Sequence, residues 1–277
     1  MENARALVAA NAGGPHSCRR MTTPWIAFTR EVSQSIVDCE LTHLSRTPIR
    51  VEVARAQHRG FERMLTSLGC EIRRVAPAPD HPDAVFVEDT AVVFDELAVI
   101  TRPGAASRRR ETIEVANVLG ALRPLARITA PGTLDGGDVL VIGRTVFVGE
   151  TTRTNEAGIS QLAAFLAPHG YVVRSIPLND CLHLKSAVTA LDDRTVLLNP
   201  QWVRAAEFAG YRILMVEASE PAAANVLRIG NALLTSSSYP RTLELLRAEG
   251  FTPHTVDTSE LAKAEGAVTC CALIVRR

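Results

Sequence analysis

Residues 138–149 read DVLVIGRTVFVG, two apolar runs that flank the pair Gly143-Arg144. Apolar, β-branched and aromatic residues on both sides of a glycine-containing pair are typical of a β-hairpin. The chain then passes through a polar loop to a helical pattern at 155–168 and to a further strand at 171–176. This stretch therefore predicts a unit of strand, turn, strand, helix and strand.

The same order of elements recurs along the chain. Strand pairs are predicted at three more places: 84–94 with 97–100, 187–190 with 195–198, and 225–229 with 232–235. Residues 25–75, with a helix at 51–68 and a strand at 71–75, could supply a fifth and more diverged copy. Small sheets repeated radially enclose a central channel. The repeat favours such a radial α/β fold, and an ordinary α/β sandwich is the alternative.

One polar residue recurs at the same place in each unit. These residues are Asp89, Asp135, His183, Asn225 and Cys270, at intervals of 42 to 48 residues. In a radial array, equivalent positions face a shared axis. We therefore expect these five side chains at the mouth of one central channel.

The composition excludes several classes of protein. The 277 residues suffice for one large domain or two small ones, and 47% of them are hydrophobic. Because 30 Lys and Arg balance 30 Asp and Glu, nothing indicates a nucleic-acid partner. No apolar stretch approaches the ~20 residues that span a bilayer.

The six cysteines form no CxxC pair, which favours reduced thiols and a cytoplasmic location. Residues 1–22 are expected to be a flexible extension before a single domain at 23–277.

A candidate nucleophile lies near the end of the chain. Cys270 stands in the segment VTCCAL (268–273), at the entry to a strand predicted at 272–275. A lone cysteine is usually a small buried apolar side chain, and we keep that interpretation for Cys271. A reactive thiol needs a lowered pKa or a nearby base. His183, in LHLKS (182–186), could be that base or a structural histidine; if this segment is extended, His183 and Lys185 face the same side.

Carboxylates cluster in two further segments. Asp135 and Asp138 flank two glycines, which allow a tight turn that can direct one carboxylate inward. A carboxylate beside His183 would orient its imidazole ring, and an ordinary Asp-rich turn is the alternative. Asp83, Glu88 and Asp89 bracket an apolar stretch, where buried carboxylates require a cation. A guanidinium held by forked hydrogen bonds would satisfy this need, and a solvated strand end is the alternative.

Five segments occur together and in a fixed order: FVED (86–89), ITRPGA (100–105), LDGGDV (134–139), LHLKS (182–186) and TCC (269–271). Over about residues 28–275 the chain resembles the dimethylarginine dimethylaminohydrolase family of the guanidine-modifying (pentein) superfamily. The resemblance implies a five-bladed α/β propeller, the pentein fold, with pseudo-fivefold symmetry around a central active-site channel. It also implies hydrolysis of Nω-methylated L-arginine to L-citrulline and dimethylamine or methylamine, through a covalent thiouronium intermediate on cysteine and without a metal or organic cofactor.

The resemblance assigns roles to individual residues. Cys270 is the nucleophile, His183 the general acid/base, and Asp135 the carboxylate that orients His183. The implied substrate-binding residues are Asp89 for the guanidinium, Glu88, Asp83 and Phe86 in or near its site, Arg108 and Arg153 for the α-carboxylate, and the backbone near Val32 in a lid loop for the α-amino group. For the two arginines, a surface position is the alternative.

Several functions compete with this one. Arginine deiminase has a His-x-Asp motif that clamps an unsubstituted guanidinium, whereas Lys185 stands at that place here and favours methylated substrates. An amidinotransferase, or a hydrolase of another N-substituted arginine, would use the same nucleophile. A non-catalytic binding propeller predicts the loss of Cys270 or His183, and both are present. The expected partner is a small molecule, and the chain could form a homodimer.

Overall fold

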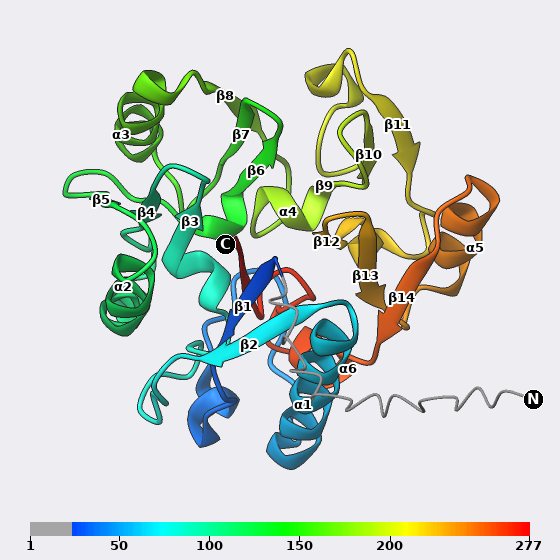
Figure 1. Ribbon diagram of the computed structural model, residues 1–277. Coiled ribbons are helices and arrows are strands. Elements are labelled where there is room, and N and C mark those ends of the chain that lie inside the picture. Colours follow the sequence, from blue (N-terminus) through cyan, green and yellow to red (C-terminus); the bar gives the residue numbers. More distant parts are fainter. Residues whose placement is uncertain (1–23) are drawn as a thin grey trace, which may run out of the picture.

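In the computed structural model, which describes residues 24–277, the strands group into five separate three-stranded sheets. The sheets surround a common centre (Figure 1). Their strands are β1 (Trp25–Thr29), β2 (Cys70–Arg74) and β15 (Leu273–Arg276); β3 (Ala91–Val93), β4 (Ala98–Ile100) and β5 (Leu125–Arg127); β6 (Val139–Ile142), β7 (Thr145–Glu150) and β8 (Val172–Pro177); β9 (Val188–Ala190), β10 (Thr195–Leu198) and β11 (Arg212–Met215); β12 (Leu227–Ile229), β13 (Ala232–Ser236) and β14 (Pro253–Val256). The extension predicted at 1–22 lies outside the described residues.

Every sheet has the same topology. The central strand pairs antiparallel with one neighbour and parallel with the other, as β7 does with β6 and β8. Two of the hairpin turns contain Gly143 and Gly230, whose φ angles of +60° and +58° suit glycine. A parallel neighbour requires a longer crossover, which is usually helical. Four crossovers are the helices α1 (Val51–Ser67), α2 (Thr112–Gly120), α3 (Glu156–Leu166) and α5 (Pro240–Ala248).

The last strand of the chain closes the ring. β15 pairs antiparallel with β1, with Trp25 opposite Arg276 and Phe28 opposite Leu273. It therefore takes the place in its sheet that β3, β6, β9 and β12 take in theirs. Because the turn before β15 carries Cys270, this closure brings the predicted nucleophile to the centre of the ring.

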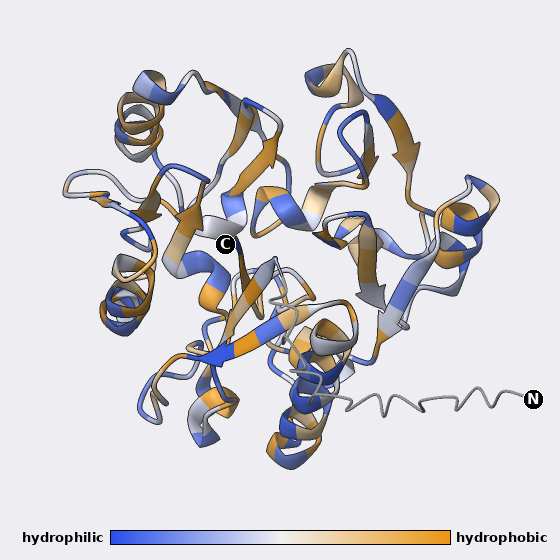
Figure 2. Ribbon diagram, viewed as in Figure 1, coloured by the Kyte–Doolittle hydropathy of each residue, from blue (hydrophilic) through white to orange (hydrophobic). Residues whose placement is uncertain are grey.

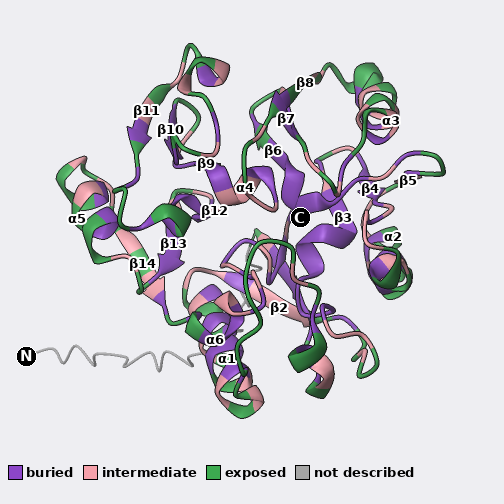
Figure 3. Ribbon diagram, turned by 180° about the vertical axis from the view of Figure 1, so that it is seen from behind, coloured by how far each residue is buried: buried purple, intermediate pink, exposed green. Residues whose placement is uncertain are grey.

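Apolar side chains fill the space between neighbouring sheets. One buried cluster contains Val99 of β4 and both Val146 and Val148 of β7. Another joins Phe61 of α1 with Leu234 of β13 across the closure of the ring. The strands are largely hydrophobic (Figure 2), and exposed residues gather on the outer helices (Figure 3). Burial of these faces fixes the sheets around the centre.

Within residues 24–277, no helix has both the length and the hydropathy that a bilayer span requires.

One local prediction was wrong. The strand predicted at 84–94 begins only at Ala91, because residues 82–85 form turns and 87–90 form the 3-10 helix η2 (Val87–Thr90). The apolar residues from Ala84 to Val87 are all buried in succession, and such a run has no period that separates a strand from a tight turn. The segment considered as extended at 182–186 instead contains a single helical turn, α4 (Leu184–Ala187).

Candidate active site

One narrow cavity at the centre of the ring brings together residues that are far apart in the sequence. Cys270 and His183 both line it. Five more of the residues predicted for the site share this lining: Asp83, Phe86, Asp89, Arg108 and Arg153. The other three predicted residues, Asp135, Glu88 and Val32, lie outside the lining.

Cys270 is fixed by contacts on both sides of its turn. Its carbonyl oxygen accepts a hydrogen bond from the backbone N–H of Glu88 at 3.1 Å. Gly266 tolerates no side chain, because a Cβ there would lie 2.2 Å from Cε1 of Phe86. Cys271, in contrast, is 1% exposed and belongs to an apolar cluster. Cys270 is therefore the thiol of this pair that faces the cavity.

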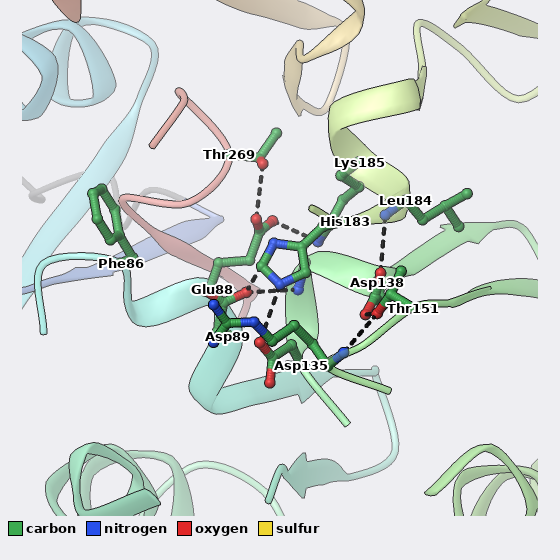
Figure 4. Close-up of polar contacts among 12 residues, drawn as sticks. Phe86, Glu88, Asp89, Asp135, Asp138, Thr151, His183, Leu184, Lys185 and Thr269 are labelled. Carbon is green, nitrogen blue, oxygen red and sulfur yellow. Dashed lines mark hydrogen bonds and ion pairs between the residues drawn. The ribbon is translucent and has the colours of Figure 1, made fainter. Parts of the chain in front are cut away.

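His183 is presented by a short helix that a carboxylate caps. Asp138 accepts hydrogen bonds from the backbone N–H of Leu184 at 3.0 Å and from the hydroxyls of Thr151 at 2.7 Å and Thr154 at 2.6 Å (Figure 4). A carboxylate at the start of a helix satisfies a backbone N–H that has no partner within the helix. Burial raises the pKa of Asp138 to about 6. Asp138 thereby anchors the helical turn that begins directly after His183.

Asp135 lies behind the imidazole ring of His183. Its Oδ2 is 3.0 Å from His183 Nε2, and its Oδ1 accepts a hydrogen bond from the Gly104 N–H at 2.9 Å. The neighbouring Gly137 leaves room for the ring, because a Cβ there would lie 2.7 Å from His183 Nδ1 and 2.8 Å from Asp89 Oδ1. The Asp-Gly-Gly-Asp turn thus supplies one carboxylate to the histidine and, through Asp138, another to the backbone.

Asp89 is held from two directions. Its Oδ1 accepts a hydrogen bond from the Gly137 N–H at 2.9 Å, and its Oδ2 accepts one from Arg108 at 2.6 Å. Oδ1 also lies 3.9 Å from His183 Nδ1. Asp89 therefore presents a buried carboxylate to the part of the cavity that His183 lines.

The two predicted carboxylate-binding arginines lie in different surroundings. Arg108 is only 5% exposed; it is bound by Asp89 and Glu111 and donates to backbone carbonyl groups. A buried charge pair of this kind is costly to break. Arg153 is half-buried in the cavity wall and donates to the hydroxyl of Thr42 at 2.9 Å. Of the two, Arg153 has fewer contacts to give up for a substrate carboxylate.

Glu88 faces a different space from its neighbour Asp89. Its carboxylate pairs with Lys185 and accepts a hydrogen bond from the Thr269 hydroxyl at 2.8 Å (Figure 4). These three residues line a separate cavity of about 370 Å³, whose walls include strands β3, β6, β12 and β15. The structure thus places Glu88 in an ion pair outside the cavity that Cys270 lines.

The predicted lid residue does not reach the cavity, whereas a later part of the same loop does. Val32 is buried in an apolar cluster, and its carbonyl oxygen accepts a hydrogen bond from Arg55. Glu40 lines the cavity instead, and its N–H donates to Asp83 at 3.1 Å. A polar loop without periodicity gave no signal for Glu40. The remaining lining residues, which only adjacency to His183 or Cys270 could have indicated, are Leu182, Ala264, Glu265 and Gly266.

Burial and neighbouring carboxylates set the charges in the site. Burial lowers the pKa of His183, but Asp89, Asp135 and Asp138 outweigh it and raise this pKa to about 9. Burial, together with Glu88 and Asp89, raises the pKa of the Cys270 thiol to about 12. His183 and Arg108 lower the pKa of Asp89 despite its burial. At neutral pH the unliganded site therefore holds a thiol, an imidazolium and a carboxylate.

Three of these residues could also hold a metal ion. Ligand atoms of Asp89, Asp135 and His183 lie within 4.8 Å of one another. Both carboxylates already accept hydrogen bonds from backbone N–H groups, and a protonated imidazole does not bind a metal. We therefore assign these atoms to a hydrogen-bond network.

Comparisons with known proteins agree on one family. A family model described as arginine deiminase matches residues 78–222. N(G),N(G)-dimethylarginine dimethylaminohydrolase of Streptomyces coelicolor is 41% identical over 261 residues, which cover 90% of this chain and 96% of that protein. The protein of the same name from Pseudomonas aeruginosa is 34% identical and covers 89% of this chain and 97% of its own length.

Solved structures confirm the fold. A Cys-to-Ser variant of the Pseudomonas aeruginosa protein, complexed with citrulline, matches with a TM-score of 0.86 at 33% identity and covers 90% of this chain and 98% of that one. The N-terminal domain of a cyanobacterial arginine dihydrolase reaches a TM-score of 0.82 at 19% identity, which shows the fold alone. The predicted α/β propeller is therefore the pentein fold, and the chain belongs to the dimethylarginine dimethylaminohydrolase family.

Proposed function

We propose that the chain hydrolyses Nω-methylated L-arginine to L-citrulline and releases dimethylamine or methylamine. The observation that carries this proposal is the single cavity lined by Cys270, His183 and Asp89. Substitution at a guanidinium carbon needs a nucleophile, a proton donor and an anion that holds the planar cation. The named relatives are dimethylarginine dimethylaminohydrolases, and a solved relative contains citrulline.

Substrate binding is expected to activate the nucleophile. In the unliganded site, burial and two carboxylates keep the thiol of Cys270 protonated, with a pKa of about 12. A guanidinium bound to Asp89 would bring a positive charge beside the sulfur. A nearby positive charge favours the thiolate and lowers the pKa of the thiol. The thiolate therefore forms in the complex with substrate, and the thiol proton passes to solvent because His183 is already protonated.

The reaction then proceeds in two substitutions. The thiolate of Cys270 attacks the guanidinium carbon, the bond from this carbon to the methylated nitrogen breaks, and His183 gives its proton to the departing amine. This leaves an S-alkylthiouronium on Cys270 and a neutral imidazole. His183 next takes a proton from water, the hydroxide adds to the same carbon, and the carbon–sulfur bond breaks. The proton of the added hydroxyl passes to the sulfur as L-citrulline leaves, which restores the thiol and the imidazolium of the unliganded site.

Lys185 supports the choice of a methylated substrate. Its ammonium group pairs with Glu88, so position 185 offers no carboxylate to a second guanidinium nitrogen. Hydrogen-bond acceptors built for an unsubstituted nitrogen would be left without partners by an N-methyl group. Without such an acceptor at this position, methyl groups on that nitrogen carry no such penalty.

Measurement of citrulline release from asymmetric dimethylarginine, monomethylarginine and arginine tests the proposal. We expect kcat/KM for both methylated substrates to exceed that for arginine by about tenfold or more, the discrimination that one small group can give. Amine release should match citrulline release one to one. Arginine as the best substrate would favour a deiminase, and citrulline formation without amine release would contradict the mechanism.

A further inference from the structure

A loop at residues 39–46, here called the entrance loop, lies at the active-site cavity and is held by one carboxylate. Glu265 accepts hydrogen bonds from three consecutive backbone N–H groups, those of Thr42 at 3.0 Å, His43 at 2.6 Å and Leu44 at 2.7 Å. Both Glu40 of the entrance loop and Glu265 line the cavity with Cys270. The loop is therefore tied to the segment that leads into the predicted nucleophile.

Apolar packing holds only the start of this loop, where Cys39 is buried and Leu41 packs against the same apolar cluster. Residues 42–46 are exposed, and Leu44 is 50% exposed. A segment that buries little apolar surface opens at a low free-energy cost. The bonds to Glu265 are charge-assisted and roughly twice as strong as neutral hydrogen bonds. The position of residues 42–46 thus depends mainly on polar contacts. Among the described side chains outside the loop that contact it, Glu265 accepts hydrogen bonds from three backbone N–H groups, whereas Asp83 accepts one. Ser107 and Arg153 contact only side chains of the loop.

The backbone of Glu265 supports a dedicated role for its side chain. Its φ angle is +56°, in the left-handed region that glycine and asparagine adopt more readily than glutamate. The next residue, Gly266, is fixed by its packing against Phe86. A non-glycine residue keeps such a conformation only when other interactions outweigh its cost. The hydrogen bonds from the entrance loop are such interactions.

We propose that Glu265 is a positioning residue that holds the entrance loop closed over bound substrate. The identity of the substrate in this inference rests on the proposed function, whereas the loop contact does not. Glu40, Asp89 and Arg153 line the same cavity, so an arginine derivative with its guanidinium at Asp89 and its α-carboxylate at Arg153 would lie against the wall that Glu40 and Arg153 form. Release of the loop removes part of this wall, so substrate dissociates faster while the reacting groups stay in place. Loss of the Glu265 carboxylate should therefore raise KM more than it lowers kcat.

Limited proteolysis reports the loop directly. Arg46 is exposed, but its side chain donates to the carbonyl oxygens of Val37 and Cys39, so trypsin needs a released loop to cut after it. In Glu265→Ala, initial cleavage after Arg46 should be about tenfold faster or more, because cleavage follows the population of the open form. Glu265→Gln keeps the shape of the side chain but not its charge, so its rate of cleavage after Arg46 should lie between those of the wild type and Glu265→Ala. Glu244→Ala, at an exposed position on α5, is the matched control and should behave as the wild type.

Kinetics with dimethylarginine complete the test. Glu265→Ala should show a KM about tenfold higher and a kcat within about threefold of the wild type, and Glu265→Asp should restore part of the KM. Equal cleavage after Arg46 in wild type and Glu265→Ala would overturn the inference, and so would faster cleavage with an unchanged KM. If Glu265→Ala fails to fold, Glu265→Gln carries both measurements. A wild type that does not turn over dimethylarginine would refute the proposed function, while the proteolysis would still decide the loop contact.

Discussion

Asp135 Oδ2 lies 3.0 Å from Nε2 of His183, while Nδ1 of the same ring lies 3.9 Å from Asp89 Oδ1. The imidazole is thus flanked by two carboxylates, and both favour its protonated form. Because Nε2 is bound to Asp135, Nδ1 is the atom left to exchange a proton with substrate. Figure 4 shows the ring between the segments that carry Glu88 and Asp138.

His183 should be protonated at neutral pH. Because its pKa is raised from the usual 6.5 to about 9, it binds a proton throughout the range in which an ordinary histidine loses one. An NMR titration of the imidazole in the unliganded protein should therefore show a midpoint near pH 9. A midpoint at or below about 6.5, the unperturbed value, would show that burial outweighs the carboxylates.

Removal of the charge on Asp135 should impair catalysis with little effect on binding. We expect Asp135→Asn to lower kcat by up to about 10⁴-fold, the loss seen when a catalytic histidine loses its orienting carboxylate. The pKa of His183 should fall in the same variant, because a raising effect is removed. Asp135→Glu keeps the charge and should retain more activity than Asp135→Asn. Wild-type kcat in Asp135→Asn would show that Asp135 does not orient His183.

Gly137 should be essential because of the space it leaves. Gly137→Ala places a Cβ within 2.8 Å of both His183 Nδ1 and Asp89 Oδ1, so one of these side chains must move. A displacement of about 1 Å in a catalytic group can reduce activity by about 10²-fold. Gly60→Ala in α1, where the new Cβ meets only ordinary contacts, is the matched control and should leave kcat/KM unchanged. Equal activity of both variants would contradict the tight packing around the ring.

Glu88 should stabilise the fold through Lys185. Lys185→Met leaves the buried carboxylate of Glu88 without its cation, and loss of one partner of a buried ion pair lowers stability by about 3–5 kcal/mol. The double variant Lys185→Met/Glu88→Gln should recover most of this loss in urea unfolding, because no buried charge remains. If Glu88→Gln alone raises KM at least about 100-fold with unchanged stability, Glu88 binds substrate, as the family resemblance implies.

Much of the fold could be predicted because its signals are local. The apolar runs around Gly143 and Gly230 determine hairpins within a dozen residues, and the Asn155 side chain caps α3 close to the predicted start of that helix. The pairing of β1 with β15 has no local signal, because it joins the two ends of the described chain. The repeat alone therefore left the fifth sheet open.

The site residues also fall into those that a sequence motif indicated and those that had no such signal. The order of the motifs indicated Cys270, His183 and Asp89, and the structure places all three in one cavity. Glu88 and Asp89 are adjacent in the sequence yet face different cavities, whereas the family resemblance implied that both lie in or near the substrate site. The entrance loop has neither periodicity nor a motif, so Val32 was chosen where Glu40 reaches the cavity. The homodimer, the location in the cell and the extension at 1–22 stay predictions.

Chemical trapping of the covalent intermediate tests the role of Cys270 most directly. Wild-type protein is mixed with dimethylarginine, quenched in acid and digested, and the peptides are weighed by mass spectrometry. The peptide with Cys270 should gain the mass of the substrate less that of dimethylamine, and Cys271→Ala should show the same gain. Cys270→Ser should show no such gain and should form citrulline at least about 10³-fold more slowly. An adduct on another residue, or wild-type turnover by Cys270→Ser, would contradict attack by this thiol.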